Sequence, residues 1–481
     1  FSALQKRAIR SAVEEGVLVV TGGPGTGKTT IIRCIISLLK AENDILLCAP
    51  TGRAAKRLGE VTGREAQTIH RCLGMSFNDL TGQVTFKKNA KDPLEAHAVI
   101  VDEMSMVDLE LMQALLEALR PGCRLVMVGD PDQLPSVGAG NVLGDMLRSG
   151  VIPAVSLTQV FRQAEQSAII RNAHRVNLGE SPDLKGNQGD FFFLCRRDAQ
   201  RAVATVLELC KTRLPDNMHI PAEQIQVLTP MQRGAVGAAN LNTLLQEALN
   251  PSETCLRRSG YSFRLYDKVM QIRNNYDKEV FNGDVGTISA LNLEERNLRV
   301  RFDDREVEYD VTELDELAQA YAVTIHKSQG SEYPIVVMPM LMTHFVMLQR
   351  NLLYTGVTRA KKLLVLVGTK KAVGYAVRNV TVTSRNTRLK ERLQGTAKFV
   401  PAAGAGCAGS LSGFSIAGAA SAGKRARASL NAPRIWRFAW NGFLLEKRAR
   451  PGSVPRFVFG KFSLQKPDFF RPSARRTFFI V

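Results

Sequence analysis

Short apolar runs alternate with longer segments of helical periodicity along most of this chain. Each run has the length of a buried strand and is far shorter than a membrane span. The segments between them carry apolar residues three or four positions apart, as amphipathic helices do. This alternation predicts an α/β fold with parallel sheets, and its strands are expected at residues 17–20, 45–50, 98–102, 124–130, 155–163, 225–230, 320–325, 335–340 and 363–367.

Two stretches break the α/β rhythm. Residues 75–97 contain a short hairpin pattern at 80–86. Residues 266–314 carry short alternating strands with Asn-Gly and Gly-Asp turns, which predict a small β-barrel inserted in a second α/β block. We therefore expect a first α/β domain, a second one in two pieces, the barrel and a tail, at residues 1–165, 166–265 with 315–395, 266–314 and 396–481 respectively.

The tail differs from the rest in composition. Residues 402–422 are almost all Ala, Gly and Ser, as in flexible linkers. The remainder is basic and aromatic, with Trp436 and Trp440, and lacks clear periodicity. It is either a platform for a single nucleic-acid strand or sequence foreign to the native protein, and we favour the second interpretation. Because the chain opens on Phe1, we expect native residues to precede it.

The net charge of +19 suggests a polyanionic partner. However, residues 401–481 hold 14 Lys or Arg against two acidic residues, so +12 of the charge lies there and only +7 elsewhere. Bulk charge is therefore weak support for nucleic-acid binding, and the motifs have to carry that inference.

The cysteines and apolar segments indicate a compartment. All eight Cys are scattered without a C-x-x-C pair, which argues against zinc and disulfides and for a reducing cytosol. The sequence shows neither a long apolar run nor a signal-peptide pattern. We expect a cytoplasmic protein without membrane contact.

The first apolar run ends in a glycine-rich turn. Residues 22–29 match G-x-x-x-x-G-K-[ST] between a strand and a helix. Backbone N–H groups of such a loop curl around phosphate oxygens, and the helix N-terminus adds a favourable dipole. An ordinary glycine turn is the alternative, but every fixed position is filled. The sequence thus predicts a nucleoside triphosphate site, with contacts from Gly23, Pro24, Gly25, Thr26, Gly27, Lys28, Thr29 and Thr30.

Acidic and amide side chains follow two other strands. Asp102 and Glu103 come directly after the third apolar run, where Asp102 with Thr29 would hold Mg²⁺ and Glu103 would polarise the attacking water. Gln133 follows the fourth run and could reach the γ-phosphate. A surface Asp-Glu pair and a proline-bounded turn are the alternatives.

The second apolar run leads into a basic helix start. Thr51 and Arg53 follow it, and a hydroxyl, backbone amides and a guanidinium suit a phosphodiester backbone. A basic solvated helix face is the alternative that the residues leave open.

Eleven segments, taken together and in order, resemble the superfamily 1 helicases, most closely the RecD-like branch. The resemblance covers roughly residues 1–368 and rests on SALQKRAI, GGPGTGKTT, APTGRAA, QTIH, DEMSMVD, GDPDQLPSVGAGNVL, LTQVFRQ, TPMQRG, NGDVGTI, TIHKSQGSE and LYTGVTRAKK. Residues 398–481 do not resemble the C-terminus of that family.

The resemblance implies two RecA-like domains that hydrolyse ATP with Mg²⁺ between them. Gln5 would contact the adenine edge and Glu332 the ribose. Gln133 would couple the γ-phosphate to DNA, while Arg162 and Arg359 would be arginine fingers.

The same resemblance implies 5′→3′ movement on single-stranded DNA and at junctions with duplex, in repair or recombination, alone or beside other recombination subunits. The hairpin region would split strands, and the barrel would be SH3-like. The implied DNA contacts are Thr51, Arg53, Thr68, His70, Thr324, His326 and Lys327.

Three other functions remain open at this point. A translocase that does not unwind would share every ATP motif. A P-loop enzyme acting on a partner other than nucleic acid would leave QTIH and TIHKSQGSE unexplained. A non-enzymatic DNA-binding scaffold would not need Lys28, Glu103 and Arg359, all of which are present.

Overall fold

The computed structural model describes residues 1–399 except 40–43, 79–82, 161–165, 186–188, 259, 276, 303–304, 381–384 and 386, and gives only the backbone of 396–399. Arg162, the tip of the expected hairpin and nearly all of the tail lie outside the described residues.

The first lobe is a parallel six-stranded sheet in the order β3-β2-β6-β7-β1-β8. Its strands are β1 (Val17–Gly22), β2 (Ile45–Ala49), β3 (Ala66–Thr68), β6 (Ala98–Val101), β7 (Arg124–Gly129) and β8 (Ala154–Leu157). The helices of this lobe are α1 (Ala3–Glu14), α2 (Lys28–Leu38), α3 (Gly52–Thr62), α4 (Ile69–Cys72), α5 (Leu109–Ala118) and α6 (Val142–Ser149).

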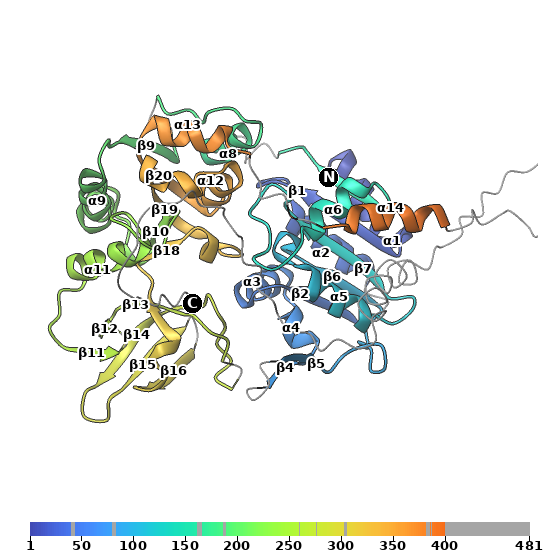
Figure 1. Ribbon diagram of the computed structural model, residues 1–481, viewed down its shortest axis with the longest axis horizontal. Helices are drawn as coiled ribbons and strands as arrows, with labels where there is room; N and C mark the ends of the chain where they lie inside the picture. Colours follow the sequence, from blue (N-terminus) through green and yellow to red (C-terminus); the bar gives the residue numbers. More distant parts are fainter. Residues whose placement is uncertain are drawn as a thin grey trace, which may run out of the picture. The chain divides into compact units, whose positions relative to one another are not determined.

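Strand β1 shows why helices cover both faces of this sheet. All six of its residues are buried, and successive side chains point to opposite faces. Val17 and Val19 join one apolar core with α5 and α6, while Leu18 and Val20 join another with α1 and α2. Figure 1 shows the helices on either side of the sheet.

The second lobe is a parallel five-stranded sheet in the order β18-β10-β19-β20-β9. Its strands are β9 (Phe191–Cys195), β10 (Ile225–Thr229), β18 (Ala322–Thr324), β19 (Tyr333–Met340) and β20 (Ala360–Gly368). Its helices are α8 (Ala168–Asn177), α9 (Ala199–Glu208), α10 (Leu214–Met218), α11 (Ala238–Leu249), α12 (Arg350–Val357) and α13 (Lys370–Arg378).

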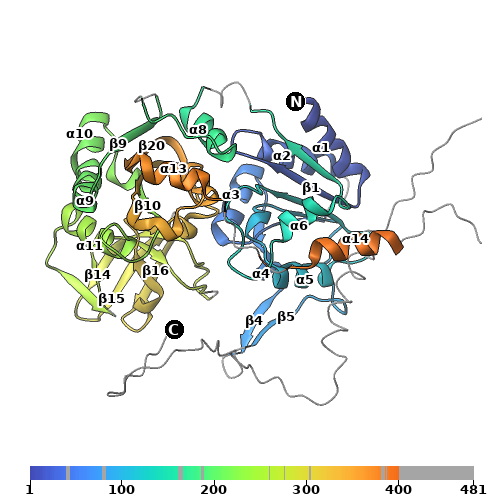
Figure 2. The same ribbon diagram turned by 45° about the horizontal axis from the view of Figure 1, so that its top comes forward.

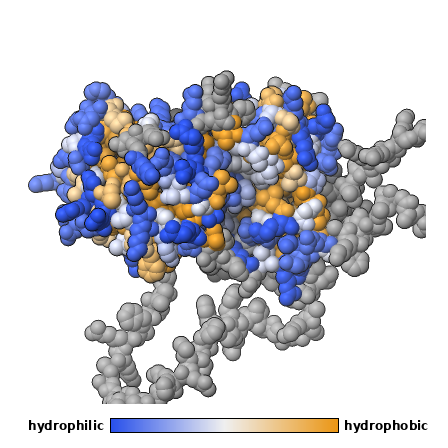
Figure 3. Space-filling model, turned by 90° about the horizontal axis from the view of Figure 1, so that it is seen from above, coloured by the Kyte–Doolittle hydropathy of each residue, from blue (hydrophilic) through white to orange (hydrophobic). Residues whose placement is uncertain are grey.

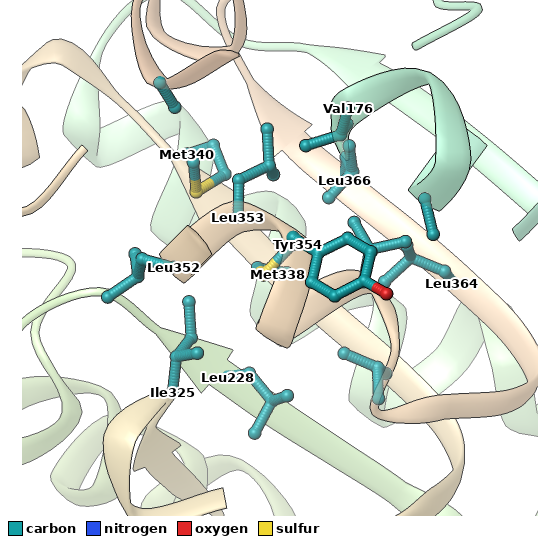
Figure 4. Packing of buried hydrophobic residues seen from close by; sticks show 14 of the residues in the cluster. Val176, Leu228, Ile325, Met338, Met340, Leu352, Leu353, Tyr354, Leu364 and Leu366 are labelled. Carbon is teal, nitrogen blue, oxygen red and sulfur yellow. The ribbon is translucent and has the colours of Figure 1, made fainter. Parts of the chain in front are cut away.

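Two apolar cores also cover the faces of the second sheet. Leu364 and Leu366 of β20 pack in one core with α8, α12 and α13, while Leu363 and Val365 pack in the other with α9 and α11. Figure 4 shows the first of these cores around the ring of Tyr354.

An antiparallel five-stranded sheet interrupts the second lobe, in the order β16-β15-β14-β13-β17. Its strands are β13 (Lys268–Gln271), β14 (Val285–Asn292), β15 (Asn297–Phe302), β16 (Arg305–Asp310) and β17 (Leu317–Gln319). It has an apolar core of its own, so it is a separate packing unit. It reaches five residues beyond the expected end at residue 314, because β17 pairs with β13. A hairpin of β11 (Cys255–Arg258) and β12 (Tyr261–Arg264) precedes it.

The α/β class, the parallel sheets and the SH3-like insertion are thus confirmed. The hairpin region holds the antiparallel pair β4 (Met75–Asn78) and β5 (Gln83–Phe86), which extends away from the first sheet (Figure 2). Among the described residues, no helix is long and apolar enough to cross a membrane. The face in Figure 3 is hydrophilic with smaller hydrophobic areas between.

The chain returns to the first lobe at α14 (Leu389–Phe399). Leu389 and Leu393 of this helix are buried in the same core as α5 and α6. The sequence analysis assigned residues 315–395 as a whole to the second domain. A lone amphipathic helix does not reveal which lobe its apolar face will cover.

Candidate nucleotide site and nucleic-acid interface

The glycine-rich loop between β1 and α2 adopts a backbone that depends on its glycines. Gly25 and Gly27 have φ angles of 74° and 82°, in the left-handed region that favours glycine. A Cβ on Gly22 would lie 2.6 Å from Oγ1 of Thr26, closer than real contacts allow. The loop is therefore compact, and its curvature fits an anion cradle.

Thr26 and Gln5 brace this loop from within the fold. The hydroxyl of Thr26 donates to the carbonyl of Gly23 at 2.8 Å, and the amide of Gln5 donates to the carbonyl of Thr26 at 3.2 Å. The other end of Gln5 accepts from the backbone N–H of Ser2 at 3.0 Å and completes a capping box on α1. The structure thus places Gln5 against the loop, fully buried.

Lys28 lies inside the curve of the loop. Its ammonium donates to the carbonyls of Gly22 at 2.6 Å and Gly23 at 3.0 Å. Thr29 and Thr30 follow in the first turn of α2, half-buried and exposed respectively. The lysine therefore marks the side of the loop at which a β- or γ-phosphate would bind.

Asp102 and Glu103 stand at the end of β6. Glu103 has φ 52°, an uncommon conformation for a residue other than glycine, and its N–H donates to the carboxylate of Asp102 at 2.8 Å. Burial, aided by the charge of Glu103, raises the pKa of Asp102 to about 6, although Lys28 and Arg57 oppose the shift. Two carboxylates and a lysine thus share one region, where the hydroxyl of Thr29 and the carboxylate of Asp102 offer the hard oxygen ligands that Mg²⁺ prefers.

The loop after β7 contains a buried carboxylate with partners in both lobes. Asp130 accepts a hydrogen bond from the hydroxyl of Tyr354 at 2.8 Å and one from the amide of Gln133 at 3.4 Å. Burial raises the pKa of Asp130, and the nearby charge of Lys28 opposes this. Burial and the charge of Asp130 also raise the pKa of Tyr354. Asp130 therefore links the surroundings of Lys28 to α12.

Two further hydrogen bonds hold this loop to the second lobe. The backbone N–H of Leu134 donates to the hydroxyl of Thr355 at 2.9 Å, and its carbonyl accepts from the amide of Gln329 at 2.9 Å. The sequence analysis quoted the segments that contain Asp130 and Tyr354 but gave neither residue a role. The signal was present, since both stand inside quoted motifs, but their pairing was not.

Arg359 is buried at the end of α12 and bonded within its own lobe. Its guanidinium donates to the carbonyls of Thr355 at 3.2 Å and Ser331 at 3.1 Å, and to the hydroxyl of Thr358 at 3.2 Å. Its charge acts to lower the pKa of Tyr354, so the arginine belongs to the same electrostatic neighbourhood as Asp130.

Glu332 lies beside α3 and forms ion pairs with Arg57 at 2.6 Å and Lys361 at 3.3 Å. Arg53 donates to the hydroxyls of Ser331 at 2.9 Å and Tyr333 at 3.1 Å, with its guanidinium over the tyrosine ring. The described contacts of Glu332 are therefore with basic side chains near α3 and not with the phosphate loop.

These residues line a groove of about 720 Å³ between α3, the SH3-like insertion and the start of β19. Three residues expected from the sequence meet there, namely Arg53, Thr68 and Glu332. Thr51 caps α3 by accepting from the N–H of Ala54 at 3.3 Å.

The remaining expected DNA contacts occupy the ends of edge strands. His70 follows β3 in the first lobe, and Thr324, His326 and Lys327 follow β18 in the second. Burial lowers the pKa of both histidines and of Lys327. For His70 the charge of Asp108 opposes the shift.

Three family models match the chain. They are described as an AAA domain over residues 5–139, an ATP-dependent RecD-like DNA helicase SH3 domain over 241–302, and a UvrD-like helicase C-terminal domain over 319–367. The matched ranges fall on the first lobe, on a region that includes part of the antiparallel insertion, and on the second lobe.

The chain is also similar to curated proteins and to a solved structure. The ATP-dependent RecD2 DNA helicase of Deinococcus radiodurans is 39% identical over 379 residues, 79% of this chain, which spans 50% of that relative's length. Pif1 helicase from Bacteroides, solved with ADP-AlF3 and ssDNA, aligns with TM-score 0.48 and 18% identity over 77% of this chain and 94% of that one.

The RecBCD enzyme subunit RecD of Mycobacterium tuberculosis is 31% identical over 432 residues, which are 82% of this chain and 73% of that relative. Identity of this extent over most of both sequences, together with the three domain matches in chain order, establishes that the chain belongs to the RecD-like branch of the superfamily 1 DNA helicases.

Proposed function

We propose that this chain is an ATP-driven helicase motor that moves along single-stranded DNA and separates strands where single-stranded DNA meets duplex. Its relatives' names describe ATP-dependent DNA helicases and subunits of a recombination complex. The observation that carries the proposal is the position of the loop after β7, which joins the nucleotide region to the second lobe.

That loop provides a route from phosphate charge to lobe movement. Asp130 senses the charge of Lys28 on one side and bonds Tyr354 on the other, while Leu134 bonds Thr355 and Gln329. When the γ-phosphate leaves, the electrostatic field at Lys28 changes, and the hydrogen bonds of this loop can redistribute. The proposed consequence is a cycle in which the two lobes close with ATP and separate after hydrolysis.

The roles within the site follow from charge and geometry. Lys28 and the loop amides would neutralise phosphate charge, Glu103 would orient and deprotonate the attacking water, and Gln133 would contact the γ-phosphate. Mg²⁺ bound by Thr29 and Asp102 would stabilise the charge that develops on the phosphates. Arg359, with Arg162, would complete the site from the second lobe as arginine fingers.

The DNA path would follow two sets of residues. Thr51, Arg53, Thr68 and His70 would hold the strand on the first lobe, and Thr324, His326 and Lys327 on the second. If one set tightens as the other loosens, each hydrolysis moves the strand in one direction, and family membership favours 5′→3′. We further propose that the β4–β5 hairpin separates strands and that the protein acts in DNA repair or recombination in the cytoplasm.

ATP hydrolysis measured against single-stranded DNA concentration tests the motor. We expect strong stimulation by DNA, and loss of turnover in Lys28→Ala. Turnover indifferent to DNA would contradict the proposal and favour an NTPase that acts on another partner.

Strand separation on duplexes with a 5′ or a 3′ overhang tests polarity and unwinding. We expect unwinding only from the 5′ overhang, and less of it when residues 76–85 are replaced by a short Gly-Ser turn while DNA-stimulated hydrolysis persists. Stimulated hydrolysis without any strand separation in the unaltered protein would identify a translocase.

A further inference from the structure

His174 places a buried, unpaired ring nitrogen beside the phosphate loop. It lies on α8 of the second lobe, and its Nε2 is buried without a hydrogen-bond partner among the residues that the structure describes. The ring faces Gly23 closely, because a Cβ built on that glycine would lie 3.3 Å from Cε1 of His174. The same position would lie 3.0 Å from the hydroxyl of Tyr354.

The rest of α8 shows that packing alone does not require a histidine here. Ala173 and Val176 bury the apolar side of the helix in the core of its own lobe. Asn177, three residues after His174, donates to the carboxylate of Asp132 at 2.6 Å in the loop after β7. Residues three apart share a helix face, so His174 and Asn177 form a polar face directed at the first lobe.

An unpaired buried nitrogen costs stability unless some state of the protein provides a partner. The groups around Gly23 narrow the choice. Lys28 lies against the carbonyls of Gly22 and Gly23, and a lysine of this motif reaches the β- and γ-phosphates. Gly23 therefore marks the end of the loop nearest the γ-phosphate. An N–H of His174 at this position can donate to a phosphate oxygen.

We propose that His174 is a γ-phosphate-binding residue that the second lobe contributes to the site, in addition to the two arginines. This proposal rests on the proposed function, since it assumes that ATP binds the loop. His174 then distinguishes ATP from ADP, because only ATP carries the group that its Nε2 contacts. Together with Asn177, it makes α8 a second connection between the nucleotide and the second lobe, independent of α12.

Nucleotide affinity measured for a set of variants tests the proposal. The probes are a non-hydrolysable ATP analogue and ADP, each titrated with Mg²⁺ and single-stranded DNA. His174→Phe keeps a ring of similar size and removes the donor, whereas His174→Gln keeps a donor. We expect His174→Phe to weaken analogue binding on the order of tenfold and to change ADP binding by less than about twofold.

The matched controls separate donor loss from damage to the fold. Arg175→Ala alters the exposed neighbour on the same helix and should leave both affinities unchanged. His174→Gln should recover part of the analogue affinity, and all variants should melt near the temperature of the unaltered protein.

Equal weakening of analogue and ADP binding by His174→Phe, or no weakening of either, would overturn the proposal. Failure of the proposed function looks different, since the unaltered protein itself would then bind neither nucleotide and Lys28→Ala would change nothing.

Discussion

The two lobes share one sheet edge and differ at another. In both, an edge strand ends in Thr-Ile-His, at Thr68 after β3 and at Thr324 after β18. Each threonine accepts from the backbone N–H three residues later, at 3.1 Å in the first lobe and 3.4 Å in the second. The neighbouring strands β2 and β10 are each followed by a proline. This edge is the part that we propose holds DNA.

The difference appears at the fifth strand of each order. Strand β1 of the first lobe leads into the glycine-rich loop and Lys28. Strand β9 of the second lobe leads into Arg196 and Asp198, and Asp198 caps α9 by accepting from the N–H of Arg201 at 2.7 Å. A common framework thus carries two proposed grips on DNA but a single phosphate loop. An engine with one fuel site needs the second lobe to respond to it.

The strongest way to break this comparison is to remove the response of the second lobe at Arg359. We expect Arg359→Ala to reduce DNA-stimulated turnover by about 10³-fold or more, because an arginine finger stabilises transition-state charge. Binding of a non-hydrolysable ATP analogue should persist, because the phosphate loop belongs to the first lobe. Steady-state hydrolysis and analogue titration measure the two quantities.

Arg359 is also bonded to three groups of its own lobe, so its removal needs controls. Lys362→Ala, at an exposed neighbour on β20, should leave turnover unchanged. Arg359→Lys retains the charge and should still fail if the guanidinium geometry matters. Near-normal turnover in Arg359→Ala would remove this residue from the mechanism.

Acid should weaken the second lobe through His344, in the 3-10 segment Met342–Met347. This histidine is buried with Nδ1 unpaired among the described residues, and burial lowers its pKa from 6.5 to about 4. The fold therefore holds the neutral ring, whereas the unfolded chain takes up a proton below about pH 6.5. Stability is complete above that pH and falls by about 3 kcal/mol as the pH drops to about 4.

His344→Leu should flatten this part of the pH dependence. Urea unfolding at several pH values measures it, and hydrogen exchange should report the loosening in η7 and α13 before the first sheet. An unchanged slope in the variant would assign acid sensitivity to other groups.

Tyr354→Phe sharpens the comparison at the contact between the lobes. Loss of the hydroxyl leaves the buried carboxylate of Asp130 with a long bond to Gln133 as its remaining side-chain partner among those described. We expect a loss of about 2 kcal/mol in unfolding free energy and a weaker DNA stimulation of hydrolysis. A double-mutant cycle with Asp130→Asn measures the coupling, and simple additivity would argue against a working contact.

Local motifs allowed the sequence to predict much of the first lobe. The helix N-cap at Ser2, the strand before the phosphate loop and the carboxylates after β6 depend on neighbours in sequence, and the structure shows each of those elements. The β4–β5 pair also followed from a local alternation, although the tip lies outside the described residues. Chemical roles, in contrast, remain proposals.

The parts that the sequence did not predict depend on long-range packing. Asp130 and Tyr354 are 224 positions apart, so no periodicity relates them. His174 gave no signal because a single histidine on an amphipathic helix is most often a core or surface residue. The place of Leu389 in the first core was hidden for a similar reason, since an apolar stripe does not name its partner.

The return of α14 to the first lobe constrains how the motor can move. The chain crosses from the first lobe to the second between β8 and α8 and crosses back between α13 and α14. Two covalent tethers define an axis, whereas a single one would allow the halves to swivel. Opening and closing should therefore follow one preferred arc, as in a door on two hinges, so that each turnover repeats the same stroke.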